Sequence, residues 1–371
     1  MGEGSMVRFI KKNVVFCVAL LAAAVTCFFV PPDSGYADYF DWKTLSCLFL
    51  TLVVVCALRN IKFFTIMARK LVLLSGSLRL LFLVLVLITF VGSMLIANDM
   101  ALITFLPLGY FALSVTRQER YMAYLFILQN ISANLGGMLT PFGNPQNLYL
   151  YTYFNIPAGE FCAMMLPPFL LAISLLALCC LLVKPEKLHI AEEFPEKLNV
   201  RRAALYIVLF LISVLIVFRV VSVFVGMIFV PLVMLLADPD ALKDVDYGLL
   251  GTFLCFFIFS GNLARIDAVS AFFSTLLEKD TLLVSIASCQ VISNVPTAIL
   301  FSRFTTDYHP LLLGVNIGGA GTLIASLASL ITFSEFRVLY PGHGKLYFGL
   351  FTLINAIFLV VMTVAAKLFF L

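Results

Sequence analysis

The stretch 134–151 reads "NLGGMLTPFGNPQNLYLY" and interrupts an apolar segment, 121–150, that would otherwise form one long membrane helix. As a continuous helix this segment would be about 45 Å long, whereas the hydrocarbon core of a bilayer is about 30 Å thick. Paired glycines weaken a helix, and each proline in the stretch removes a backbone donor. We therefore predict a broken helix. Its freed carbonyls and its amide side chains are then available to ions or to a polar solute.

The composition indicates a chain that crosses a lipid bilayer many times. Of the 371 residues, 62% are hydrophobic and 12% are charged, whereas a soluble domain is about half apolar and about a quarter charged. We expect an all-α polytopic membrane protein with about nine transmembrane helices, two re-entrant hairpins and two broken helices. The first apolar run, 13–30, has no convincing signal-peptidase site and is predicted to remain as the first helix.

Several function classes have no support in the sequence. It contains no P-loop, no HExxH motif and no nucleophile elbow, so we expect neither an ATP-driven pump nor an enzyme. The nine cysteines lie in apolar stretches without CxxC spacing, which predicts neither a disulfide framework nor a metal site. We expect no cofactor other than Na⁺ or H⁺ as a coupling ion, and no nucleic acid as a partner.

Two other apolar stretches, 80–116 and 281–303, carry polar residues at their centres. The first contains "ANDM" at 97–100 and the second contains "SNVPT" at 293–297. The second stretch has 23 residues, too few for two crossings, although the 37 residues of the first would suffice. We predict that both are re-entrant hairpins, each made of two half-helices that meet at a polar tip inside the protein.

The distribution of basic residues tests this topology. With a cytoplasmic N-terminus and with both hairpins returning to their starting side, 18 of the 24 Lys and Arg residues fall on the cytoplasmic side. This bias is the orientation signal expected of a multi-pass protein of the cell membrane. Six basic residues remain for the opposite side: Lys43, Arg219, Arg265, Lys279, Arg303 and Lys367.

A charged cytoplasmic connection at 184–202 divides the chain into two similar halves. The first repeat is predicted to cover 1–183. The second half, 203–371, is predicted to hold a linker helix followed by the second repeat. Each half contains one of the hairpins and one broken helix, at 121–150 in the first half and at 310–333 in the second.

Short motifs support this division. "FDW" at 40–42 and "VDY" at 245–247 each open a predicted helix, and "NLGG" of the first break matches "NIGG" at 316–319 in the second. On the charge-based topology the two repeats have opposite orientations in the membrane. Inverted repeats with paired broken helices are the sequence signature of secondary transporters.

The paired breaks and tips supply the predicted binding residues. Amide and hydroxyl side chains donate and accept hydrogen bonds, so they suit an oxyanion, and amide or backbone carbonyls suit a cation. The predicted substrate-binding residues are Asn98, Asn134, Asn144, Asn147, Ser293, Asn294, Thr297 and Asn316. The predicted cation-coupling residues are Asn98, Asp99, Gly136, Gly137, Asn294, Gly318 and Gly319.

Asp99 is the acidic residue that this topology places at membrane depth, whereas the other 19 lie in loops or near the interfaces. An intramembrane carboxylate is costly and indicates function. It can ligate a cation or carry a proton, or it can cap a local helix and face water. The sequence leaves these three interpretations open.

At these residues the chain resembles the ion transporter superfamily with its citrate transporter-like domain. "ANDMALITFLPL" at 97–108 is similar to the first hairpin of arsenite efflux permeases, and the two breaks resemble those of divalent anion:sodium symporters. In the symporters a Ser-Asn-Thr motif at each tip binds carboxylate and sodium. Here the tips read Ala97-Asn98-Asp99 and Ser293-Asn294-Val295. Both tips of this chain keep the asparagine of the symporter motif, whereas they lack most of its flanking hydroxyl residues.

The resemblance implies a homodimer whose hairpin-bearing domain moves in an elevator fashion. Our leading hypothesis is a secondary active transporter for a small anion or oxyanion, carboxylate-like or arsenite-like, coupled to sodium or protons. The charge of Asp99 disfavours a doubly charged anion unless this carboxylate is protonated or paired with a cation. A sodium/proton antiporter that uses Asp99 is the alternative. A non-transporting sensor or a channel is a second alternative, although the sequence has neither a soluble output domain nor a continuous polar stripe.

Overall fold

The computed structural model describes residues 13–188 and 198–371. Over these residues the chain forms helices and no β-strand, which confirms the predicted all-α class. In this part of the chain, seven helical stretches are long and apolar enough to cross a bilayer, and two shorter apolar helices, α2 (Val14–Phe29) and α11 (Val223–Ala237), accompany them. The predicted cytoplasmic N-terminus before residue 13 and the centre of the charged connection, 189–197, lie outside the described residues.

The first half runs from α2 to α9. After α2 its helices are η1 (Ser34–Tyr39), α3 (Trp42–Asn60), α4 (Phe63–Leu73), α5 (Leu78–Ile96), α6 (Asn98–Val115), η2 (Glu119–Tyr121), α7 (Met122–Gly136), η3 (Gly137–Leu139), α8 (Pro145–Tyr153) and α9 (Ala158–Leu181). The second half runs from α10 to the C-terminus. Its helices are α10 (Val200–Val217), α11, α12 (Pro239–Lys243), α13 (Tyr247–Ala264), α14 (Asp267–Ile292), α15 (Asn294–Phe301), α16 (Tyr308–Gly318), α17 (Leu327–Leu339), α18 (Gly344–Ala365) and the final turn η4 (Ala366–Phe370).

The two halves begin their matching parts in the same way. Asp41 of "FDW" caps α3 by accepting a hydrogen bond from the N–H of Thr44 at 3.0 Å. Asp246 of "VDY" caps α13 by accepting one from the N–H of Leu249 at 2.9 Å. Both motifs therefore open helices, as the sequence predicts, because an aspartate at this position satisfies a backbone donor of the first turn.

Each hairpin turns at a single residue, Ala97 in the first and Ser293 in the second. The first joins α5 to α6, and the second joins the part of α14 after a non-helical residue, Asp280, to α15. α5 and α6 have 19 and 18 residues, so each is long enough to cross a hydrocarbon core, whereas α15 has 8. The two hairpins are thus unequal in length, and their re-entrant insertion stays a prediction.

Both predicted breaks occur. α7 ends at Gly136 and α8 begins at Pro145, where proline is favoured because the first residue of a helix needs no donor. In the second half α16 ends at Gly318 and α17 begins at Leu327. α17 also continues to Leu339, past the predicted end at 333. Its charged residues Glu335 and Arg337 therefore lie in the last turns of a helix and not in a loop.

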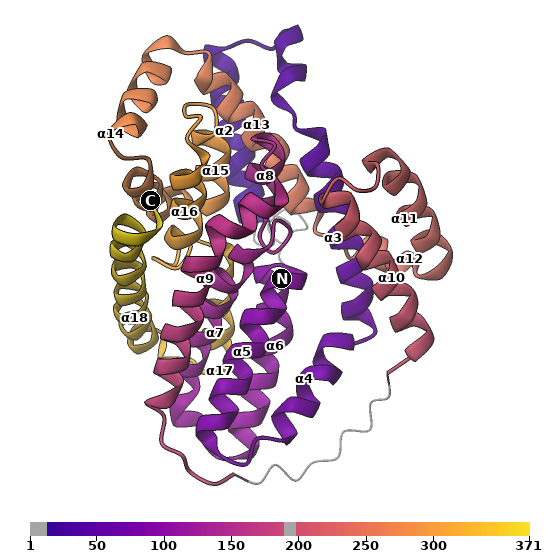
Figure 1. Cartoon of the computed structure of the whole chain (residues 1–371), viewed down its shortest axis with the longest axis vertical. Coiled ribbons are helices and arrows are strands. Elements are labelled where there is room, and N and C mark those ends of the chain that lie inside the picture. The colour runs from indigo at the N-terminus through magenta and orange to yellow at the C-terminus, as the bar shows by residue number, and fades with distance from the viewer. Residues whose placement is uncertain (1–12, 189–197) are drawn as a thin grey trace, which may run out of the picture.

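The helices pack in several pairs, and Figure 1 shows the opposed placement of the two hairpins. α2 packs along α13, and α10 and α11 pack along α3; we call these five the wall helices. The hairpins and broken helices pack on one another, α5 against α7 and α14 against α16, and form the core helices. α5 and α6 occupy the lower part of the view, and α15 and α16 the upper part. The two tips therefore approach each other from opposite ends.

Four of the six basic residues assigned to the non-cytoplasmic side have specific partners. Arginine carries fixed donors that suit carbonyl and carboxylate oxygens. The contacts are Arg219 to the carbonyl of Tyr151 at 2.8 Å, Arg303 to the carbonyl of Tyr39 at 2.6 Å, Arg265 to the carboxylate of Asp33, and Lys367 to the carboxylate of Asp280. Each of these four residues therefore makes a specific structural contact, while their side of the membrane stays a prediction.

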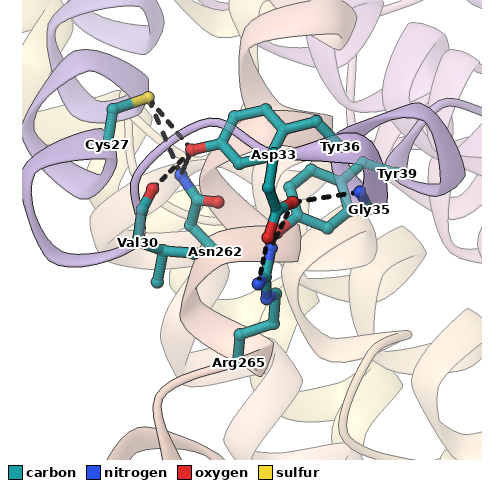
Figure 2. A network of polar contacts seen from close by, with 8 residues as sticks. All are labelled: Cys27, Val30, Asp33, Gly35, Tyr36, Tyr39, Asn262 and Arg265. Atoms are coloured by element: carbon teal, nitrogen blue, oxygen red, sulfur yellow. Dashed lines mark hydrogen bonds and ion pairs between the residues drawn. The ribbon is translucent and has the colours of Figure 1, made fainter.

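Figure 2 shows one of these contacts, which joins the loop after α2 to the end of α13. The guanidinium of Arg265 donates to both carboxylate oxygens of Asp33, at 2.9 and 2.6 Å, and to the hydroxyl of Tyr39 at 3.1 Å. One turn earlier in α13, the buried Asn262 donates to the hydroxyl of Tyr36 at 2.9 Å. A buried amide and an exposed ion pair thus fix the same loop.

We expect the buried part of this network to contribute more stability than the exposed part. Asn262→Ala should lower the free energy of unfolding by about 1–3 kcal/mol, because the buried hydroxyl of Thr26 and the half-buried hydroxyl of Tyr36 both lose a donor. Arg265→Gln should lower it less, since the paired side chains of Arg265 and Asp33 are 41% and 44% exposed. Thermal unfolding of the purified protein in detergent compares the two variants.

The ion pair also predicts a dependence on pH. Its hydrogen bonds from Arg265 hold the pKa of the Asp33 carboxyl below the ordinary value. The pair therefore stabilises the fold above the ordinary pKa of aspartate, and this contribution is lost as the pH falls through the lowered value. Wild type and Arg265→Gln should converge in melting temperature in acid. A difference that persists there would show that Arg265 acts through other contacts.

Candidate functional site

Both hairpin tips have the same unusual backbone. Ala97 has φ 65° and ψ 155°, and Ser293 has φ 74° and ψ 163°. This region suits glycine, and any other residue in it stores about 1–3 kcal/mol of strain. The next residue in each tip is an asparagine whose side-chain oxygen accepts a hydrogen bond from the following N–H, at 3.0 Å for Asn98 and 2.9 Å for Asn294. The positions that the sequence pairs therefore have matching geometry.

The second tip is fastened to the second break. The N–H of Asn294 and the hydroxyl of Ser293 both donate to the carbonyl of Ala325, at 3.0 and 3.2 Å. Thr297, a predicted substrate ligand, donates its hydroxyl to the carbonyl of Ser293 at 2.7 Å. Thr297 thus supports the strained tip from within α15, and the cavity described next is lined without it.

A cavity of about 790 Å³ lies against both tips. Its polar lining includes Asn98 and Asp99 of the first tip, Ser293 and Asn294 of the second, and Gln146 of the first break. Its walls are mostly apolar side chains of α2, α13 and α14. Among the described residues that line it, Asp99 is the one charged group, and there is no lysine, arginine or histidine. This arrangement offers amides and hydroxyls but no fixed positive charge to a solute.

A chain of amide side chains connects the tip of the first hairpin to both breaks. Asn98 donates to the side-chain oxygen of Asn134 at 3.3 Å. Asn144 donates to the carbonyl of Asn134 at 3.3 Å and to the side-chain oxygen of Asn316 at 3.4 Å. Asn316 donates to the side-chain oxygen of Asn147 at 2.6 Å. Five predicted site residues therefore form one hydrogen-bonded network that joins the two halves.

The carbonyls that the breaks leave open already have partners in this structure. The amide of Asn147 donates to the carbonyls of Gly137 and Met138, at 3.1 and 3.3 Å. In the second half Gln290, which the sequence analysis does not single out, donates to the carbonyl of Gly318 at 3.0 Å. Side-chain amides therefore bind the freed carbonyls, which the sequence-based prediction leaves available to ions or to a polar solute.

The four predicted glycines lie where helices approach closely. A Cβ on Gly136 would collide with the carbonyl of Phe90 in α5, and one on Gly318 would lie 2.8 Å from the Cβ of Cys289 in α14. A Cβ on Gly137 would collide with the side chain of Asn144, and one on Gly319 would lie 2.9 Å from the amide nitrogen of Asn294. The glycine pairs let α7 and α16 pack against the hairpins and leave room for the site amides.

Asp99 is less isolated than the sequence suggests. Its side chain lines the large cavity and also a small one of about 80 Å³, and its Oδ1 is buried with no hydrogen-bond partner among the described residues. Asp246 lines the same small cavity. From the sequence, Asp246 is expected near an interface, where the motif "VDY" opens a helix in the same way as "FDW" with Asp41. Asp99 does not cap a helix.

Most of this chain matches a known protein family. A family model described as a citrate transporter matches residues 6–312. The chain belongs to the citrate transporter family. This match includes both hairpins and the first break, and it agrees with the resemblance seen in the sequence.

Relatives of this citrate transporter family protein carry transporter or membrane-protein names. An uncharacterized transporter of Methanocaldococcus jannaschii is 33% identical over 89% of this chain and 90% of its own length. The inner membrane protein YbiR of Escherichia coli is 29% identical over 87% of this chain and 88% of its own length. The silicon efflux transporter LSI3 of Oryza sativa is 33% identical over 44% of this chain and 34% of its own length. The chain is a membrane transporter and not an enzyme.

The glycine packing in this citrate transporter family protein predicts a position-dependent effect of alanine. Gly136→Ala should lower the melting temperature by several degrees, because the new methyl group meets a backbone carbonyl that cannot move without shifting α5. Gly349→Ala in α18 is the control. A Cβ there meets nothing within 4 Å, and alanine favours a helix, so its melting temperature should stay unchanged or rise. Equal melting temperatures for the two variants would contradict this role of Gly136.

Proposed function

We propose that this protein is a secondary transporter for a small oxyacid or oxyanion that binds between the two hairpin tips and is coupled to Na⁺ or H⁺. The observation that carries the proposal is the shared cavity of about 790 Å³, against which both tips present an asparagine. Because the tips come from opposite ends of the molecule, a solute held between them is reachable from either side when one tip moves.

The charge of the cavity narrows the substrate class. A polyvalent anion would be costly in a largely apolar space without a basic side chain and beside Asp99. A hydroxylated solute with at most one negative charge avoids this cost, since amides and hydroxyls both donate to it and accept from it. The name of the relative in Oryza sativa, a silicon efflux transporter, supports a solute of this kind. A carboxylate such as citrate would need cations to enter with it.

The arrangement of helices supports a movement of the core helices past the wall helices. α2 and α13, which are wall helices, line the cavity together with the hairpin tips. Arg303, between α15 and α16, holds the carbonyl of Tyr39 in η1, so this contact would break in such a movement. A homodimer that anchors the wall helices, a cytoplasmic N-terminus and inverted repeats complete the proposal.

Transport in proteoliposomes tests the proposed function. Uptake or efflux of silicate, arsenite, phosphate and citrate should be measured under imposed Na⁺ and proton gradients. Asn98→Ala and Asn294→Ala should each slow transport about five- to tenfold, since one lost hydrogen bond to a bound solute is worth about 1–1.5 kcal/mol. Asn355→Ala is the matched control, because this buried asparagine donates to a carbonyl within α18 and lines neither cavity. Failure of every solute under every gradient would refute the proposal.

Sodium/proton exchange is the second candidate, and the buried Oδ1 of Asp99 favours it. In this mechanism the carboxylate binds Na⁺ on one side of the membrane and a proton on the other. Asp99→Asn keeps the shape of the side chain and removes the charge, so it should abolish exchange measured with a pH-sensitive dye inside proteoliposomes. Exchange that survives in this variant would exclude the second candidate.

A further inference from the structure

The small cavity lies at a junction between core helices and wall helices. Its volume is about 80 Å³, room for a few water molecules or for one partly hydrated ion. The first hairpin tip, the first break and α17 meet α3 and α13 around it. Its lining is apolar apart from Thr51, Asp99, Asn144 and Asp246.

The two carboxylates reach this cavity from different groups of helices. Asp99 lies in the first turn of α6, at the hairpin tip. Asp246 is fixed at the start of α13, a wall helix, by its hydrogen bond from Leu249. A movement of the core helices past the wall helices would therefore separate them.

Other charged groups nearby do not neutralise this pair within the cavity. Arg59, at the end of α3, donates to the sulfur of Met100 at 3.3 Å, and Asp244 accepts from the amide of Asn60 at 2.9 Å. In the described part of the chain, α3, α5, α8 and α17 contribute no titratable side chain to the lining. Among the described residues, the lining therefore carries two acidic groups and no basic one.

Two oxygens at this cavity have no donor. Asn144 is 1% exposed, and its amide nitrogen is used by the carbonyl of Asn134 and the side chain of Asn316. Its Oδ1 and the Oδ1 of Asp99 are buried without a hydrogen-bond partner among the described residues. A buried acceptor without a donor destabilises the fold, and a bound proton or a cation supplies the missing partner.

We propose that Asp99 and Asp246 jointly hold one monovalent cation, a proton or Na⁺, in the small cavity, with the side-chain oxygen of Asn144 as a further ligand. Two ionised carboxylates that face one small apolar cavity repel each other, and the repulsion is strong where water is scarce. One positive charge between them removes the repulsion and joins the hairpin to the wall helix.

The consequence for transport rests on the proposed function. With the cation bound, the first hairpin can stay against α13. Without it, the repulsion between the carboxylates favours separation of the core helices from this position. Asp246 then couples the bound cation to the movement from the wall helix, while Asp99, which lines both cavities, links this cation to the substrate cavity.

The test measures cation binding by the full-length protein in detergent and needs no substrate. Melting temperature is titrated with NaCl against choline chloride at constant ionic strength, and separately with pH. Wild type should be stabilised by Na⁺, if Na⁺ is the ion, or by acid alone, if it is the proton. Asp99→Asn and Asp246→Asn should each weaken the apparent cation affinity about tenfold or more, since each removes one charge of the pair.

Asp41→Asn is the matched control. Asp41 caps α3 as Asp246 caps α13, but it does not line the small cavity. Asparagine is a good helix cap, so both substitutions should preserve their helices. The control should leave the cation dependence unchanged even if it alters the melting temperature. Asp246→Ser, which also preserves the cap, replaces Asp246→Asn if the latter does not fold.

Two results would overturn the inference. One is a wild-type protein whose melting temperature responds neither to Na⁺ nor to acid. The other is an Asp246 variant with wild-type cation affinity, which would leave Asp99 to bind the cation without the wall helix. Either result leaves the proteoliposome test of the proposed function intact. Conversely, a protein that binds the cation through both carboxylates but transports no solute would refute the proposed function alone.

Discussion

Lipid offers no hydrogen bonds, so each backbone group that a broken helix opens at membrane depth must find a partner inside the protein. The rest of this structure depends on how that requirement is met. Asn147 satisfies two carbonyls at the start of the first break, and Gln290 satisfies one at the start of the second. Asn316 in turn fixes the side chain of Asn147 from the other half of the chain. The breaks are therefore stable because the two halves pack together, and the packing brings both hairpin tips to one cavity.

The electrostatics of the site follow from the same design. The amides that bind the backbone and line the cavity carry no net charge. The few ionised groups therefore dominate the electrostatic selection of solutes. The large cavity has one carboxylate and the small cavity has two, and the described lining of both lacks basic side chains. A cation is favoured at such a place, and an anion is accepted more easily once its charge is reduced or balanced. In the proposed function, this asymmetry would link a cation to the movement of an acidic or hydroxylated solute.

Features set by local chemistry could be predicted from the sequence. Paired glycines locate both breaks and proline helps to locate the first. The Asp-aromatic motifs locate two helix starts, and the polar tips at Asn98 and Asn294 are confirmed as matched turns. Features that depend on tertiary contacts could not be predicted from the sequence. The partner of a freed carbonyl can be an amide anywhere in the chain, and Asp246 looks like an ordinary helix cap until α13 is placed beside the first hairpin. The inverted orientation and the re-entrant insertion of the hairpins stay predictions, because they depend on the position of the bilayer.

The hydrogen bond between Asn316 and Asn147 joins residues 169 positions apart. A substitution at either asparagine removes the support of the other, so neither half is free to diverge alone. A chain that arose by duplication of an ancestral half would, from the moment this bond formed, evolve as one unit in which paired replacements succeed and single ones fail.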